Sequence, residues 1–268
     1  MVGTRTLAIR AGRADDKAME HKIIGSTMPA LEIALAPGES VVAEGGELSW
    51  MTGSIQLHTA ANKAGTGKVM GMMRRAMSGA TFFMTEYAAE GAPGMVAFAT
   101  KLPGHIKAIE LDGAREYMVH RRGYLCGTPD VSLGIGFQQK LTAGFFGGEG
   151  FILQRVGGQG QAWVELDGEV VEYDLPAGEV LRVHPGHVGL FEASVTFEIE
   201  RVKGIKNILF GADSLFLAKL TGPGKVFLQT LPLANLAGAL RPYMEFEGGT
   251  KSSASGGLGG AIGGLLGS

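Results

Sequence analysis

Two histidines separated by a Pro-Gly pair are the residues of this 268-residue chain that come nearest to a chemical site. His184 and His187 flank residues 185–186, and Glu192 follows them. Two imidazoles and a carboxylate are donors that hold a divalent ion. No histidine follows His187, and the two rings fall near the ends of different expected strands. A metal-dependent enzyme using His184 and His187 is therefore kept as an alternative, and no metal site is predicted.

Other patterns of catalytic residues are missing. Residues 65–68 fail the P-loop pattern, because Asn62 stands where a glycine is needed and Val69 stands where Ser or Thr is needed. No serine lies in a nucleophile elbow, and the glutamates have no spacing that implies a shared site. We predict a protein that is not an enzyme, with no catalytic residues and no cofactor.

Composition and charge limit the partners. The net charge of −2 gives no field that would attract the whole protein to nucleic acid, which is therefore not the expected partner. Cys126 is the single cysteine, so no intramolecular disulfide can form, and a small buried thiol is expected. No apolar run reaches the ~20 residues that a membrane-spanning helix needs. We predict a cytoplasmic location, with association at a membrane surface kept open.

The elements that would position any site are β-strands. Residues 195–200 alternate between apolar and polar side chains, as do residues 131–137, and a period of two is typical of a half-buried strand. Glycine-led turns separate the apolar runs, including a turn predicted at residues 157–160 between two strands. The same order of strands occurs three times: an apolar strand, which starts at Thr81, Gly150 or Ser214, is followed by a glycine-rich turn and a last strand that closes the unit.

The repeat predicts one unit written three times. We expect an N-terminal extension, three β modules and a flexible glycine-rich tail, with the boundaries 1–22, 23–104, 105–170, 171–245 and 246–268.

An apolar segment precedes the repeated strand in each module. If the modules surround a pseudo-threefold axis, these segments meet on one surface that suits a partner or a membrane. The alternative is that they pack the joints between modules, where methionine fills irregular gaps. The residues predicted to form this interaction surface are Met72, Met73, Arg74, Arg75, Phe145, Phe146, Ile208, Leu209 and Phe210.

Several strings between about residues 23 and 245 resemble the AIM24 family, which is related in fold to the tryptophan RNA-binding attenuation protein (TRAP). They are residues 148–153, 203–211, 215–217 and 221–229, and the tail at residues 256–268 is also similar to that family's C-terminus. The resemblance implies an all-β fold of three fused TRAP-like double-stranded β-helix, or β-sandwich, modules around a pseudo-threefold axis. Mitochondrial members of that family are associated with inner-membrane organisation. The resemblance implies no catalytic residues for this chain.

Three functions follow as hypotheses. The first is a non-enzymatic interaction or scaffold protein of the AIM24 family that associates with a protein partner, with itself or peripherally with a membrane. The second is a TRAP-like module that binds a small ligand or RNA, although fold alone does not transfer RNA binding. The third is the metal-dependent enzyme that uses His184 and His187.

Overall fold

Nearly all the regular structure of this protein is β-strand, which confirms the predicted all-β class. The computed structural model describes residues 19–59, 84–139, 150–201, 216–240 and 243. Its strands form antiparallel sheets, and its described helices are the 3-10 turn η1 (Pro185–His187) and the α-helix α2 (Leu233–Leu240). The helix α2 was not predicted. No helix in the described part of the chain is long and apolar enough to cross a membrane.

The strands fall into three consecutive sets along the chain. The first set contains β1 (His21–Ile24), β2 (Ala30–Leu35), β3 (Ser40–Glu44), β4 (Trp50–Met51), β5 (Ile55–Thr59), β6 (Met84–Ala89) and β7 (Gly94–Ala99). The middle set contains β8 (Gly104–Asp112), β9 (Tyr117–His120), β10 (Tyr124–Gly127), β11 (Val131–Gln139) and β12 (Phe151–Asp167). The third set contains β13 (Val170–Leu175), β14 (Val180–Val183), β15 (Val188–Glu192), β16 (Thr196–Arg201), β17 (Phe216–Thr221) and β18 (Gly224–Gln229).

One pairing pattern occurs in every set. We label six strands a to f in chain order: β2 to β7 in the first set and β13 to β18 in the third, while β8 to β11 are a to d of the middle set and β12 supplies both e and f. Strand a pairs with f, b with e, c with f and d with e in the first set. The same four pairings occur in the middle set and in the third.

The turn predicted at residues 157–160 is wrong, because β12 is one strand through this segment. Its first part pairs with β11 up to Gly158, and its second part pairs with β8 from Gln159 onward. Gly158 and Gly160 have φ of 93° and 116°, values that glycine adopts without strain. These glycines let the strand change partners without leaving the sheet.

The buried core crosses the boundaries between sets. One apolar cluster joins Leu31 and Phe98 of the first set to Trp163 of the middle set, and another joins Leu153 of the middle set to Phe191 of the third. Trp163 is fully buried, and burial of one large apolar side chain contributes roughly 1.5–3 kcal/mol. The sets therefore share their cores and fold together. Cys126 is buried as expected, and burial raises the pKa of its thiol well above the ordinary value.

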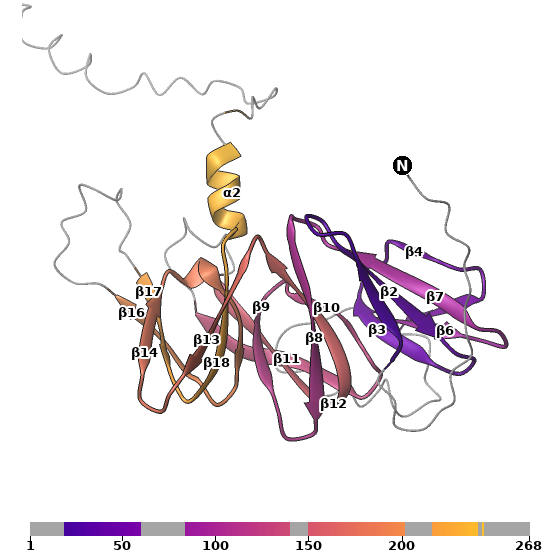
Figure 1. Cartoon of the computed structure of the whole chain (residues 1–268), viewed down its shortest axis with the longest axis horizontal. Helices are drawn as coiled ribbons and strands as arrows, with labels where there is room; N and C mark the ends of the chain where they lie inside the picture. Colours follow the sequence, from indigo (N-terminus) through magenta and orange to yellow (C-terminus); the bar gives the residue numbers. More distant parts are fainter. Residues whose placement is uncertain (1–18, 60–83, 140–149, 202–215, 241–242, 244–268) are drawn as a thin grey trace, which may run out of the picture.

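The sets follow one another along the longest axis of the molecule (Figure 1). Strand β4 lies near one end of this axis and β14 near the other, whereas β9 and β12 lie between them (Figure 1). The pseudo-threefold axis expected from the sequence is not confirmed by this arrangement. The predicted module boundaries also stay predictions, although the strand sets begin and end near them.

Gly104 offers a test of the close β8–β12 contact. An added Cβ at this position would lie 2.1 Å from the backbone oxygen of Leu166, which cannot move without breaking the pairing. We expect Gly104→Ala to lower the free energy of unfolding by about 1–3 kcal/mol, as overpacking does. Urea unfolding followed by circular dichroism measures this change.

The matched control is Gly134→Ala in β11, where an added Cβ meets no heavy atom within 4 Å. This variant is expected to keep the free energy of unfolding within about 0.5 kcal/mol of the parent. Equal destabilisation by both substitutions would contradict the predicted role of Gly104.

Candidate functional site

The nine residues predicted to form an interaction surface all lie outside the described residues. They fall at positions 60–83, 140–149 and 202–215, of which the structure gives no account. The predicted surface of Met72, Met73, Arg74, Arg75, Phe145, Phe146, Ile208, Leu209 and Phe210 therefore stays a prediction.

His184 and His187 are neighbours, with ring centroids 5.9 Å apart. His187 Nδ1 lies 2.8 Å from the backbone oxygen of Gln229, and the amide of Gly186 donates to His184 Nδ1 at 3.3 Å. Glu192 accepts a hydrogen bond from the amide of Lys225. Within residues that the structure describes, no group of three or more His, Cys, Asp or Glu side chains could hold a metal ion.

Two joints connect the sets, and both use the same strands. At each joint, strand c of the later set pairs with strand b of the earlier one: β10 with β3, and β15 with β9. Tyr124 crosses the first joint, where its hydroxyl donates to the backbone oxygen of Val42 at 2.9 Å. The four joint strands are mostly buried. A joint is therefore an apolar, antiparallel contact between a b edge and a c edge.

One b strand and one c strand have no such partner in the described structure. Strand β4, which is c of the first set, pairs with β7 alone, and β14, which is b of the third set, pairs with β17 alone. Their side chains are correspondingly accessible: Trp50 is 44% exposed, Met51 37% and Val180 39%. We call these two strands the free c edge and the free b edge.

Exposed apolar side chains gather toward the same two sets. Among the described strand and loop residues, none of the large exposed apolar side chains lies between residues 58 and 170, a range that includes the whole middle set. Those of the first and third sets are Ile23, Met28, Trp50, Met51, Leu57, Val171, Tyr173 and Val180. Exposed apolar groups concentrated in this way mark an interaction surface more often than scattered ones do.

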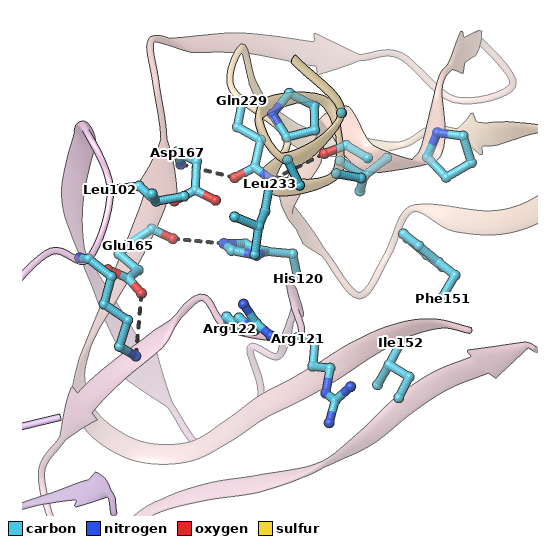
Figure 2. Close-up of a pocket in the computed structure, with 18 of the residues that line it drawn as sticks. Leu102, His120, Arg121, Arg122, Phe151, Ile152, Glu165, Asp167, Gln229 and Leu233 are labelled. Carbon is cyan, nitrogen blue, oxygen red and sulfur yellow. Dashed lines mark hydrogen bonds and ion pairs between the residues drawn. The ribbon is translucent and has the colours of Figure 1, made fainter. Parts of the chain in front are cut away.

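A pocket of about 620 Å³ lies between the middle and third sets and is bounded by α2. Figure 2 shows Leu233 of α2 in the pocket, with Phe151 and Ile152 on one side and Leu102 and Glu165 on the other. This volume is within the range of sites that hold small organic ligands.

Hydrogen bonds fix the wall formed by β12. Lys101 donates its backbone amide to Glu165 Oε2 at 3.3 Å, and its ammonium pairs with Glu47. His120 Nε2 lies 3.0 Å from the backbone oxygen of Glu165. Gln229 connects the sets, because its side-chain oxygen accepts from the amide of Asp167 and its side-chain nitrogen donates to the oxygen of Gly186 (Figure 2).

Burial dominates the titration of the acidic groups in this pocket. It raises the pKa of Glu165 to about 7, although the charge of Lys101 and its backbone amide act in the opposite direction. Burial also raises the pKa of Asp167, against the positive charges of His120, Arg122 and Lys101. It lowers the pKa of His120. Near neutral pH the pocket therefore carries less negative charge than its carboxyl groups suggest.

Sequence reasoning missed this pocket, because its lining comes from segments far apart in the chain. Arg121 and Arg122 lie at the end of β9, while Glu165, Gln229 and Leu233 lie many residues later. The available signal was the basic pair at residues 121–122 before Gly123, next to a strand end. Nothing in the spacing of these residues predicts that they meet.

Comparison with known proteins gives a family and a fold. The family model described as "Mitochondrial biogenesis AIM24" matches residues 21–231. A protein of Streptococcus pyogenes serotype M6, described as uncharacterised, is 27% identical over 222 residues, which are 81% of this chain and 87% of that protein. A crystal structure of a Streptococcus pyogenes protein has a TM-score of 0.66 and 24% identity, and covers 84% of this chain and 100% of that one. The crystal structure supports the fold alone.

The raised pKa of Glu165 predicts a pH dependence of stability. Because the folded pKa of about 7 exceeds the ordinary value of 4.5, the folded state holds an extra proton between these two pH values. The contribution of Glu165 to stability is therefore highest below pH 4.5 and falls as the pH rises to about 7. We expect Glu165→Gln to remove this loss, so that the free energy of unfolding of the variant relative to the parent rises from pH 5 to pH 8.

Urea unfolding of both proteins at several pH values tests this expectation. Glu179→Gln, at an exposed position, is the control and is expected to leave a constant difference from the parent. A constant difference for Glu165→Gln as well would refute the raised pKa.

Proposed function

This chain belongs to the AIM24 family, and we propose that it is a non-enzymatic scaffold protein whose copies associate head to tail through their free sheet edges. The proposal rests on one observation: among the residues that the structure describes, the row of sets ends with an unpaired b edge and an unpaired c edge. These are the two kinds of edge that pair at both internal joints. A second copy thus offers each edge the partner that the chain itself uses twice.

The physical reason for association is the cost of an open edge. Unpaired backbone N–H and C=O groups on a strand are a template for another strand, and natural proteins usually shield them with charge, proline or a covering element. Here the free c edge carries Trp50 and Met51, and the free b edge carries Val180 beside Arg182, whose charge is paired with Glu200. Pairing would satisfy backbone groups and remove apolar surface from water.

The short length of β4 is compatible with this role. At the first internal joint a single residue pair, Gly127 with Val42, is in register between β10 and β3. Much of that joint is held by buried side chains and by the hydroxyl of Tyr124. A two-residue edge flanked by apolar side chains is therefore sufficient for a joint of the same kind.

A contact between different edges has a consequence for the size of the assembly. Such a heterologous contact leaves one free edge of each kind after every addition, so it ends only when a ring closes and otherwise grows as a filament. The positions of β4 and β14 near opposite ends of the molecule exclude pairing between them within one chain (Figure 1).

The hypotheses of membrane contact, another protein partner, RNA binding and a metal-dependent reaction stay proposals. Peripheral membrane contact and a different protein partner would use the same exposed apolar groups, but neither explains why the two edges complement each other. No described contact favours RNA or a metal-dependent reaction at His184 and His187. The cytoplasmic location stays a prediction.

Two variants test the head-to-tail contact. Trp50→Lys with Met51→Lys places charge on the free c edge, and Val180→Lys places charge on the free b edge, as shielded natural edges do. We expect the parent protein to form assemblies larger than a single chain, and each variant to elute as a single chain. Size-exclusion chromatography with light scattering measures the masses.

An equimolar mixture of the two variants distinguishes head-to-tail from head-to-head contact. Each variant retains the edge that the other lacks, so the mixture can form one joint and should contain a species of two chains. If either variant alone still forms dimers, the contact joins like edges and the proposal is wrong. Leu57→Lys on β5 is the control, because the equivalent strands β11 and β16 take no part in the joints. It should assemble like the parent.

A further inference from the structure

The pocket beneath α2 contains an ionisable carboxyl group where the architecture requires only a hydrogen-bond acceptor. Register identifies equivalent positions in the three sets, because strand a pairs with f through one leucine–glycine pair in each. These pairs are Leu35 with Gly94, Leu111 with Gly160 and Leu175 with Gly224. Five residues after each glycine stand Ala99, Glu165 and Gln229. The side-chain oxygen of Gln229 accepts from the backbone amide of Asp167, as Glu165 Oε2 accepts from that of Lys101, so the fold needs a hydrogen-bond acceptor here but not an ionisable carboxyl group.

Glu165 is 4% exposed, and burial of its ionised form opposes folding. An ionisable group that costs stability in a cleft, where an amide would serve the fold, is a candidate for ligand binding. Glu165 lies in the wall of a pocket that is large enough for a small ligand.

The charge of the pocket favours an anion. Its lining includes three basic side chains, Lys101, Arg121 and Arg122, against the two acids Glu165 and Asp167. The ammonium of Lys101 pairs with Glu47. The charge of Arg121 acts to lower the pKa of Glu44, which burial raises. In the described part of the chain Arg122 has no hydrogen bond or close ion pair, and its positive charge acts on Asp167 only from a distance. Its guanidinium is exposed at the pocket and can bind a carboxylate or phosphate through two N–H groups.

The rest of the lining is mostly apolar. Leu102, Phe151, Ile152 and Val188 come from the strand sets, and Leu233 comes from α2. No residue of α2 is buried, and Figure 1 shows the helix projecting from the sheets. An apolar ligand body placed under α2 would remove the side chain of Leu233, now 38% exposed, from water.

We infer that this pocket binds a small amphipathic acid, with its single anionic head at Arg122 and its apolar body between Phe151, Ile152 and Leu233 of α2. Partial protonation of Glu165 at neutral pH reduces its repulsion of the anionic head. Because the pocket lies between the middle and third sets, the inference does not rest on pairing of the free edges. The same head chemistry occurs in a free fatty acid and in an alkyl phosphate.

Isothermal titration of the full-length protein with four probes tests the inference. Octanoate and octyl phosphate combine a charged head with an apolar body, whereas inorganic phosphate lacks the body and octanol lacks the charge. We expect at least one of the first two to bind ten times more tightly than both of the last two, and the tighter one identifies the head group. Equal binding of octanol would refute the role of Arg122, equal binding of phosphate would refute the apolar contact, and no binding by any probe at millimolar concentration would overturn the inference.

Variants locate the ligand. Arg122→Gln should weaken binding of the preferred probe at least tenfold, and Leu233→Asn should weaken it several-fold. Arg115→Gln is the matched control, since Arg115 is an exposed arginine paired with Asp112 outside the pocket. Urea unfolding of each variant shows whether it is folded. Unchanged affinity in folded Arg122→Gln would place the ligand elsewhere and overturn the proposed site.

Discussion

The pairing of b edges with c edges is the constraint on which the rest of this structure depends. Within a set, strands b and c pair with different partners, e and f, so each keeps one open edge. An open edge presents backbone N–H and C=O groups that can pair with another strand, and so favours association. The chain satisfies them by placing strand c of each set against strand b of the set before it. The order of the sets, their shared cores and the two free edges all follow from this one rule.

The shared cores make the sets interdependent. Because Trp163 packs with residues of the first set and Leu153 packs with residues of the third, removing one set would expose apolar surface on its neighbour. Glycines make this continuity possible where β12 bends. Gly158 and Gly160 occupy positive φ, so one strand serves both halves of the middle set without a loop.

The sequence predicts local elements well because their causes are local. Alternation at residues 195–200 identifies a half-buried strand, and the described structure has β16 there. The same local logic fails at residues 157–160, where glycines permit both a turn and a bent strand, and where the partners β11 and β8 decide the outcome. It fails for the pocket too. Arg122, Glu165 and Leu233 are brought together by the joint between two sets, and that joint leaves no mark in their spacing.

The residue that ends strand b differs in chemistry between the three sets. Strand b ends at Glu44, His120 and Val183, which pair with Met84, Leu153 and Ala218 of strand e. Glu44 is satisfied by the side-chain amide of Gln154 at 2.6 Å, and Val183 is buried without any polar group. Strand b can thus end in an acid, an imidazole or an aliphatic side chain in the same architecture.

The fold therefore does not determine which side chain ends strand b. His120 ends its strand against the backbone of Glu165, so the middle set alone places an imidazole and a buried carboxyl group on one wall. In the third set strand b ends at Val183 and the position of Glu165 carries Gln229, whereas in the first set strand b ends at Glu44 and that position carries Ala99. Strand pairing therefore explains why β9 and β12 form this wall, but it does not determine which side chains lie on it. The chemistry of the wall is independent of the scaffold, which is the expected relation between a fold and a site placed on it.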